Sequence, residues 1–211
     1  MSTELESLIA SGCVSLSLPV SKHIVARLAA FVCLLSRWNK VYNLTAIRDQ
    51  QKMVSHHILD SLAIVPYIDG RSLLDIGTGA GIPGMPLALA VSGINIDCLD
   101  ASAKKLRFVQ HVIGELDVEN AQTVHSRVEA YHPLNRYDQV MSRAFSSLSD
   151  MHTQARHLCQ PEGSLLAMKG KIHNDEIAKL VALGVEPEII ELNITGLDAE
   201  RHLVKWKPGN N

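Results

Sequence analysis

From residue 72 onward, short apolar runs alternate with longer runs whose apolar residues recur at helical spacing. The short runs predict buried strands and the longer ones predict helices. Strands that alternate with helices form a parallel sheet with helices on both faces, so the pattern predicts a doubly wound α/β fold. The expected strands are 72–76, 94–99, 121–124, 139–141 and 164–168, and the expected helices are 85–91, 103–116, 150–158 and 174–183.

The two ends of the chain differ from this middle part. Residues 20–40 and 50–65 have helical spacing, and Pro19 suits the first turn of the earlier helix. Residues 185–192 and 202–206 have no good helix between them, which predicts an antiparallel pair at one edge of an otherwise mostly parallel sheet. We therefore expect an N-terminal helical extension over residues 1–69 and the α/β domain over residues 70–211.

Composition limits the classes of protein to consider. A chain of 211 residues with 46% hydrophobic residues is long enough for one sizeable core and an accessory segment. The N-terminus carries Glu4 and Glu6 in place of a basic leader, and the apolar stretch 28–35 is too short to span a bilayer. The four cysteines form no C-x-x-C pair and are expected as buried thiols. We expect a cytoplasmic protein without a membrane segment.

Charge and histidine content give no support for two further functions. The net charge is −2, so nucleic-acid binding would have to rest on local basic patches or on resemblance. The patches are Arg37 with Lys40, residues 104–107, and Lys169 with Lys171, and each alone is typical of a solvated face. Ten histidines are present, but no H-E-x-x-H motif occurs, and we expect no metal.

A glycine-rich loop follows the first expected strand. Residues 77–84 have the sequence Gly-Thr-Gly-Ala-Gly-Ile-Pro-Gly and precede a helix. In open parallel sheets, ligands bind beyond the carboxyl ends of the strands. Glycines let the backbone approach a ligand closely, and the helix N-terminus presents unpaired amides. The loop therefore predicts a cofactor site, although a purely structural turn is a further alternative.

Two cofactors compete for this loop. Gly79, Gly81 and Gly84 form a literal G-x-G-x-x-G, and Asp100 follows at the end of the second strand, so spacing alone permits NAD. Charge favours S-adenosylmethionine, because the Asp75 carboxylate would repel a diphosphate and would tolerate an ammonium and a sulfonium. Pro83 also removes a backbone donor that a phosphate would use.

Residues after the second and third strands are further candidates for nucleoside contacts. Asp100 can accept hydrogen bonds from both ribose hydroxyls, or it can cap the helix that begins near Ala103, for which Ser102 is better placed. Glu129 follows the third strand, where an adenine amino group would lie. Ser126 and Glu129 also have the spacing of a capping box, so both interpretations stay open on spacing alone.

The end of the fourth strand is where the acceptor of a transferred group would lie. Its sequence is Ser142-Arg143-Ala144-Phe145, with no Asp/Asn-Pro-Pro-aromatic loop and no cysteine nucleophile. These absences argue against methylation of an exocyclic amine or of a pyrimidine carbon. Arg143 is either an ion-pair partner at the surface or, in a cleft, a ligand contact.

The chain resembles the bacterial small-subunit ribosomal RNA guanine-N(7)-methyltransferase G family, also called glucose-inhibited division protein B. The resemblance covers nearly the whole chain. It departs from the family at Ala80, at Ile82 and at residues 101–103, and none of these changes removes a charged contact. The matching segments are 38–39 and 42–45, 57–61, the loop 75–86, 126–129, 142–145, 169–170 and 200–203.

The resemblance implies a class I methyltransferase fold and cofactor contacts at Gly77, Ile82, Val128, Glu129 and Arg143. Asp75, Gly79 and Asp100 join them on the argument from the loop and the second strand. The implied partner is small-subunit ribosomal RNA or the 30S particle. The rival functions are an NAD(P)-dependent oxidoreductase, permitted by the glycine spacing, and a non-catalytic RNA-binding assembly protein.

Methylation at guanine N(7) would need no general base, because that nitrogen has a lone pair and carries no proton. Orientation of the nitrogen in line with the methyl group would supply most of the acceleration, so no catalytic acid or base is expected. An arginine on the Hoogsteen edge would block N(7), so we expect Watson–Crick-edge contacts and stacking, with Phe145 as a candidate. Arg37, Lys40 and Arg48 in the extension either dock RNA or belong to a helical cap over the core.

Overall fold

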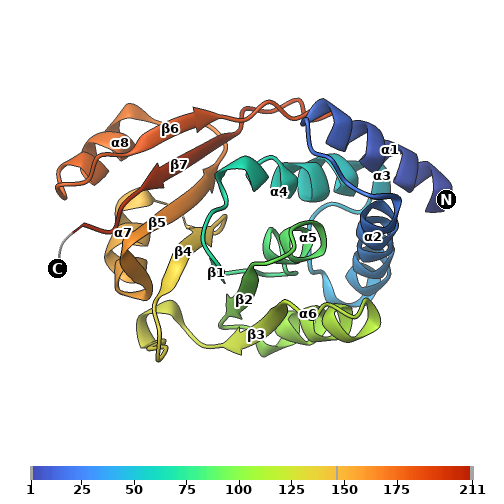
Figure 1. Cartoon of the computed structure of the whole chain (residues 1–211), viewed down its shortest axis with the longest axis horizontal. Helices are drawn as coiled ribbons and strands as arrows, with labels where there is room; N and C mark the ends of the chain where they lie inside the picture. Colours follow the sequence, from blue (N-terminus) through green and yellow to red (C-terminus); the bar gives the residue numbers. More distant parts are fainter. Residues whose placement is uncertain (1, 146, 210–211) are drawn as a thin grey trace.

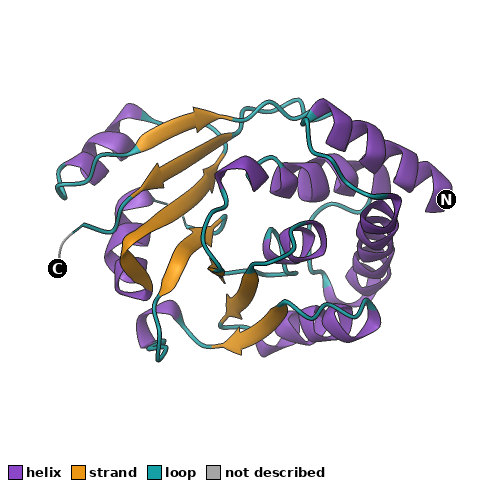
Figure 2. Ribbon diagram, viewed as in Figure 1, coloured by secondary structure: helices purple, strands orange, loops and turns teal. Residues whose placement is uncertain are grey.

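The computed structural model describes residues 2–145 and 147–209 and has one seven-stranded sheet, in the order β3-β2-β1-β4-β5-β7-β6. Strands β1 to β5 are parallel, β7 is antiparallel to β5, and β6 is antiparallel to β7. Figures 1 and 2 show helices on both faces of this twisted sheet. The strands are β1 (Ser72–Ile76), β2 (Asn95–Asp100), β3 (Ala121–His125), β4 (Tyr137–Ser142), β5 (Cys159–Lys169), β6 (Glu188–Glu191) and β7 (His202–Trp206).

The expected α/β fold and the antiparallel pair at one edge are confirmed. All seven expected strands are present, and β5 extends further toward its N-terminus than the apolar run predicted. The final pair enters the sheet through β7, which lies between β5 and β6. The helices of this part are α5 (Gly84–Ala90), α6 (Ala103–Glu115), α7 (Leu148–Ala155) and α8 (Asn174–Val181), with 3-10 turns at Val128–Ala130 and Arg156–Leu158.

The N-terminal part contains one helix that was not expected, α1 (Ser2–Ser15). Its buried stripe is narrow, since only Leu5, Ile9 and Cys13 point into the core. Gly12 lets α1 approach the following helices, because a Cβ on this residue would lie 2.3 Å from a methyl carbon of Leu59. Glycine and serine have low helix propensity, so a helix was not predicted for this segment.

The expected helix over residues 20–40 is α2 (Lys22–Tyr42). The placement of Pro19 in its first turn was wrong, because the Ser21 side chain caps the helix by accepting a hydrogen bond from the backbone N–H of Ile24. Asn43 ends α2 in a left-handed conformation.

The expected helix over residues 50–65 is interrupted. It consists of α3 (Gln50–Met53), a π-helical turn (Val54–Leu59), α4 (Asp60–Leu62) and a 3-10 turn (Val65–Tyr67). A π-helical turn adds a residue to one turn of helix and is often found at functional sites. Here it carries His56 and His57 and directly precedes Asp60.

Two apolar clusters hold the sheet between its helical layers. Leu73 of β1 packs on the face covered by α1, α2, α4, α5 and α6, whereas Leu74 packs on the face covered by α7 and α8. The first cluster contains residues from the N-terminal helices and from the strands, including Phe31 of α2 and Phe108 of α6. None of the helices within the described residues has both the length and the apolar character required to cross a membrane.

We expect Phe31→Ala to destabilise the whole chain in a single transition, because Phe31 is fully buried and its ring centroid lies 6.1 Å from that of Phe108. Removing a buried phenylalanine side chain costs about 3 to 5 kcal/mol. The measurement is denaturant unfolding followed by tryptophan fluorescence, in a Trp206→Phe background that reports from α2 and a Trp38→Phe background that reports from β7.

Val14→Ala is the matched control, since Val14 is 77% exposed on α1. It should change the free energy of unfolding by less than about 0.5 kcal/mol. Different midpoints at the two tryptophans would show that the N-terminal helices and the sheet unfold separately.

Candidate functional site

The candidate site lies where the strand order reverses. β1 has β2 on one side and β4 on the other, so the loops after β1 and β4 diverge at the carboxyl edge of the sheet. A cavity of about 270 Å³ opens there. Its lining comes from the ends of four strands and from α7, namely Ile76, Gly77, Leu99, Asp100, Ala101, Ser126, Arg127, Val128, Glu129, Ala144, Phe145 and Gln154.

The glycine loop forms one wall of this cavity through Gly77. Gly77 has a φ of +67°, and a Cβ there would lie 2.8 Å from the Cβ of Ala144. A side chain at this position would therefore strain the backbone and push apart the loops that follow β1 and β4. Gly84 allows a second close approach, since its Cβ would lie 2.8 Å from the Asp75 carboxylate.

Asp75 organises the loop from below. Its side chain is fully buried, and Oδ2 accepts hydrogen bonds from the hydroxyl of Thr78 at 2.6 Å and from the backbone N–H of Gly84 at 2.9 Å. Oδ1 has no hydrogen-bond partner in the described part of the chain. Burial raises the pKa of Asp75 to about 6, against the lowering effect of its two donors. The carboxylate is therefore ionised at neutral pH and holds the loop closed around it.

Asp100 links the loop to the end of β2. Oδ2 accepts a hydrogen bond from the backbone N–H of Gly79 at 2.9 Å, and Oδ1 accepts one from the backbone N–H of Ser102 at 2.8 Å. Ser102 begins α6 without a side-chain cap, so its expected capping role was wrong, and the Asp100 carboxylate takes part of that role. Each carboxylate oxygen retains a further lone pair, and the residue lines the cavity.

The turn after β3 supplies Val128 and Glu129 to the same cavity. The capping box that its spacing permitted is not formed. The hydroxyl of Ser126 donates to the backbone carbonyl of Arg127 at 2.9 Å, and the turn has no side-chain cap hydrogen bond. Glu129 therefore does not serve a helix start, and it lies on the cavity wall.

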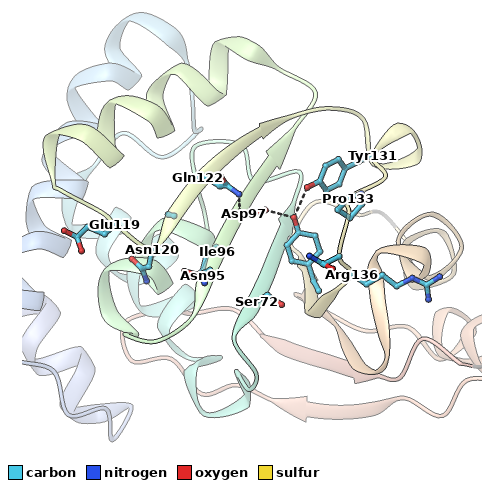
Figure 3. A pocket seen from close by; sticks show the side chains of 13 residues that line it. Ser72, Asn95, Ile96, Asp97, Glu119, Asn120, Gln122, Tyr131, Pro133 and Arg136 are labelled. Atoms are coloured by element: carbon cyan, nitrogen blue, oxygen red, sulfur yellow. Dashed lines mark hydrogen bonds between the residues drawn. The ribbon is translucent and has the colours of Figure 1, made fainter.

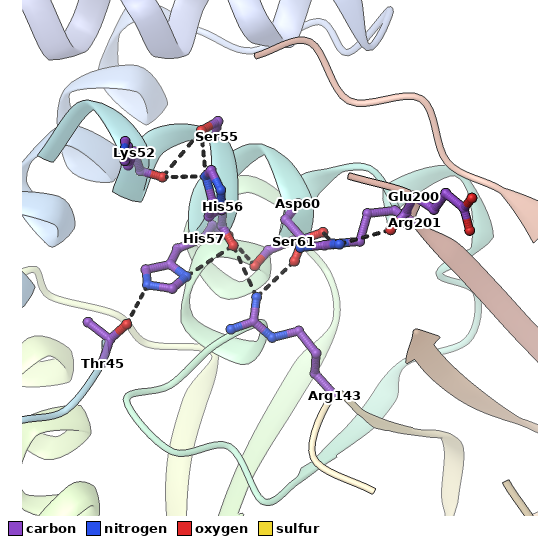
Figure 4. A network of polar contacts seen from close by, with 10 residues as sticks. All are labelled: Thr45, Lys52, Ser55, His56, His57, Asp60, Ser61, Arg143, Glu200 and Arg201. Atoms are coloured by element: carbon purple, nitrogen blue, oxygen red, sulfur yellow. Dashed lines mark hydrogen bonds and ion pairs between the residues drawn. The ribbon is translucent and has the colours of Figure 1, made fainter. Parts of the chain in front are cut away.

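Arg143 lies outside the cavity lining, although it follows β4 directly. Its Nη1 donates to the backbone carbonyl of His56 at 3.1 Å and forms an ion pair with Asp60 at 2.8 Å (Figure 4). Asp60 is 1% exposed, and its second oxygen accepts a hydrogen bond from Nε of Arg201 at 2.9 Å. One buried carboxylate thus joins the N-terminal helices, the β4 loop and the start of β7 (Figure 4).

His57 lies beside this ion-pair cluster and is held on both ring nitrogens. Nε2 is 2.9 Å from the hydroxyl of Thr45, and Nδ1 is 3.0 Å from the carbonyl of His56. Burial, followed by the charge of Arg143, lowers the pKa of His57 to about 4. The imidazole is therefore neutral at physiological pH and has no nitrogen free to act as a base.

A second pocket, of about 550 Å³, opens at the opposite edge, where β1 to β4 begin (Figure 3). The Tyr137 hydroxyl donates to Asp97 at 2.5 Å and lies 2.8 Å from the Tyr131 hydroxyl. Burial raises the pKa of Tyr137, so the hydroxyl of this residue stays protonated at neutral pH. The network lies at the amino ends of the strands, and its hydroxyl groups bond to each other and to Asp97. Both observations indicate a structural role.

The structure brings together five of the expected site residues and separates the others. Gly77, Asp100, Val128, Glu129 and Phe145 line one cavity. Gly79 and Ile82 belong to the adjoining loop, and Ile82 is buried in the core beneath it. Asp60 and Arg201 lie in the segments 57–61 and 200–203 that match the family, but no role was predicted for either residue.

The residues of the cavity fit S-adenosylmethionine better than a dinucleotide. Asp100 and Glu129 place two carboxylates on the lining, the buried Asp75 adds a third beneath the loop, and its Oδ1 is unpartnered. Negative charge of this kind repels a diphosphate and favours a cationic ligand with hydroxyl and amino donors. Leu99, Val128 and Phe145 offer apolar surface for a flat base. The described residues contain no group of three or more histidine, cysteine or acidic side chains that could hold a metal.

The raised pKa of Asp75 predicts a pH dependence of stability. Because burial raises this pKa from 3.8 to about 6, the folded chain holds the proton more tightly than the unfolded chain. Stability from this group is greatest below the unfolded pKa and falls as pH rises toward 6. In urea unfolding without ligand, the wild type should lose roughly 2 to 3 kcal/mol more between pH 4 and pH 7.5 than Asp75→Asn.

Glu186→Gln is the control for this measurement, because Glu186 is an exposed carboxylate away from the loop. Its pH profile should match that of the wild type. An Asp75→Asn profile that is parallel to the wild type would show that Asp75 does not carry the pH dependence.

Sequence comparison connects this architecture with known proteins. The family model described as rRNA small subunit methyltransferase G matches residues 24–204. A relative of that name from Hydrogenovibrio crunogenus is 47% identical over 188 residues, which cover 89% of this chain and 87% of the relative. A second, from Nitrosococcus oceani, is 43% identical over 203 residues, covering 96% of this chain and 95% of the relative.

Solved structures agree on the fold. A SAM-dependent methyltransferase from Aquifex aeolicus has a TM-score of 0.57 at 15% identity, covering 74% of this chain and 93% of that one. The glycopeptide N-methyltransferase MtfA complexed with S-adenosylmethionine has a TM-score of 0.62 at 12% identity, covering 72% and 88%. With the family match over most of the chain and this shared fold, the protein belongs to the rRNA small subunit methyltransferase G family.

Proposed function

We propose that this protein transfers the methyl group of S-adenosylmethionine to N(7) of a guanine in 16S, small-subunit ribosomal RNA. The observation that carries the proposal is the carboxylate-lined cavity at the β1–β4 switch point, in a chain of this family. The partner is small-subunit ribosomal RNA, free or within the 30S particle, and work on that partner belongs in the cytoplasm.

The positions of the cavity residues support distinct contacts with the cofactor. Asp100, with a lone pair left on each oxygen, suits the ribose hydroxyls, and Glu129 suits the adenine amino group. Gly77 gives the closest approach to the loop backbone, while Gly79 and Ile82 keep the loop in shape from within it. Val128 supplies apolar surface beside the base.

In this proposal, Asp75 and Arg143 influence the bound molecules without lining the cavity. Asp75 supplies negative charge under the loop, which suits an ammonium or a sulfonium and repels a diphosphate. Arg143 keeps only part of its hydrogen-bonding capacity free, because Nη1 is bound to Asp60 and to the carbonyl of His56. Its remaining donors lie at the end of β4, beside the position of the acceptor.

Bound S-adenosylmethionine supplies an electrophilic methyl group on a cationic sulfur. The guanine N(7) lone pair would accept this methyl group without loss of a proton, so the chain would need to supply no general base. The residues beside the β4 end match that requirement, since Asp60 is engaged by two arginines and His57 is neutral and bound on both nitrogens. The contribution of the chain is then orientation and exclusion of water.

The nicotinamide-dependent oxidoreductase is not favoured. A dinucleotide would place its diphosphate against the loop that Asp75 and Asp100 hold together, where the charge is negative. A non-catalytic assembly protein is not favoured either, because the family is one of methyltransferases.

The proposal predicts methyl transfer that is specific to one position. Incubation with tritiated S-adenosylmethionine and small-subunit RNA, naked or as 30S particles, should label 7-methylguanosine at one site. The same site should lose its cationic base in cells without this protein. S-adenosylhomocysteine should raise the melting temperature, whereas NAD should not. Label in another nucleoside, or stabilisation by NAD alone, would contradict the proposal.

Phe145→Leu tests the stacking role of the ring at the end of β4. The ring lines the cavity, so it is close to the proposed cofactor site. If it stacks on the guanine, turnover on RNA should fall about 5- to 100-fold, because base stacking on an aromatic ring contributes about 1 to 3 kcal/mol. Calorimetry should show unchanged affinity for S-adenosylhomocysteine. Loss of that affinity with normal turnover at saturating cofactor would instead assign the ring to the adenine.

A further inference from the structure

Positive charge is concentrated in two separate stretches of the chain. The whole chain has 20 lysines and arginines against 22 acidic residues. Residues 22–48 and 101–114, by contrast, contain no aspartate or glutamate. Their lysines and arginines are Lys22, Arg27, Arg37, Lys40 and Arg48 in the first stretch and Lys104, Lys105 and Arg107 in the second.

The fold joins these two stretches into one surface. α2 and α6 pack against each other, and the contacts at their ends show that they run in opposite directions. Near one end, Arg27 donates to the carbonyl of Leu116 at 2.7 Å, and near the other, the ammonium of Lys104 lies 5.4 Å from the ring centroid of Tyr42. The C-terminal half of α2 therefore lies beside the N-terminal half of α6.

Aromatic rings lie at the contact between α2 and α6, next to Lys104. The ring of Trp38 is 5.1 Å from that of Tyr42 and 5.0 Å from that of His111, measured between centroids. Tyr42 is 40% exposed, and its neighbour Val41 is 70% exposed. We call this the α2–α6 surface, defined by its exposed members Arg37, Lys40, Tyr42, Arg48, Lys104, Lys105 and Arg107.

The α2–α6 surface reaches the rim of the cofactor cavity. α6 begins immediately after the segment that carries Asp100 and Ala101, both of which line the cavity. The ammonium of Lys105 lies 3.8 Å from Asp100. The Lys104 end of the surface is therefore at the carboxyl edge of the sheet, and Glu115, the first acid of α6, is at the far end of that helix.

We propose that the α2–α6 surface docks the sugar-phosphate backbone of single-stranded RNA next to the nucleotide that enters the active site. The proposal rests on the proposed function for the identity of the RNA. Clustered cations with an exposed aromatic ring are the arrangement that proteins use to track a single strand, the cations on phosphates and the ring on a base. The surface thus continues the site outward and holds the substrate by its flanking nucleotides.

The test neutralises three exposed cations of the α2–α6 surface that do not line the cavity, in the variant Arg37→Gln, Lys40→Gln, Arg107→Gln. The matched control is Arg156→Gln, Lys179→Gln, Lys207→Gln, which removes the same charge from exposed positions near α7, α8 and β7, on the other side of the molecule (Figure 1). Both variants should keep the wild-type melting temperature and the wild-type affinity for S-adenosylhomocysteine.

Binding of naked small-subunit RNA is measured by filter binding at several salt concentrations. The α2–α6 variant should bind at least about tenfold more weakly, and the slope of log affinity against log salt should fall by about 2 to 3, since each lost phosphate contact removes about 0.7 to 0.9. KM for RNA should rise with kcat unchanged at saturating RNA. The control variant should stay within about twofold of the wild type.

Equal effects of the two variants, or an unchanged salt slope in the α2–α6 variant, would overturn the inference. Vesicles of phosphatidylserine provide the other polyanion: loss of vesicle binding in that variant with RNA binding intact would also overturn it. RNA binding is measured independently of methyl transfer. A wild type that binds RNA through this surface but transfers no methyl group would contradict the proposed function and leave the docking surface supported.

Discussion

Two carboxylates at the ends of neighbouring strands hold the glycine loop in its shape. Asp75 receives the N–H of Gly84 and the hydroxyl of Thr78, and Asp100 receives the N–H of Gly79. The loop is therefore bound near its start and at its end to the β1–β2 pair, where backbone hydrogen bonding fixes the strands. The position of the cavity, its negative lining and the direction of α5 all depend on these contacts.

A third buried carboxylate sets the relation between the sheet and the segments around it. Asp60, in the helix that follows the π-helical turn, binds Arg143 of the β4 loop and Arg201 at the start of β7. Removing one partner of a buried ion pair leaves the other charge uncompensated, so all three segments stay together. The N-terminal helices are thus joined to the loop that follows β4. They also supply half of the α2–α6 surface.

Much of the fold followed from local pattern, because strands and helices differ in the period of their apolar residues. The strands β1, β2 and β7 lie within one residue of their expected bounds, and β7 pairs antiparallel with its neighbours as predicted. α1 was missed because its apolar stripe is narrow and its stability depends on packing between Gly12 and Leu59. The interruption at residues 54–59 was also not predicted, because the one residue that a π-helical turn adds is too small a change to the apolar pattern of a 16-residue segment.

The sequence by itself determined the chemistry available: a glycine loop after a strand, carboxylates at the ends of β1 and β2, and the absence of a catalytic acid–base pair by motif. Only the tertiary structure decided which of those groups face the cavity. Glu129 lines the cavity because its capping box does not form, and Arg143 turns to Asp60 because a buried carboxylate from a distant helix lies within its reach. Spacing along a chain fixes which face of its own element a residue occupies. The residue that it contacts across that face depends on how elements far apart in sequence pack together.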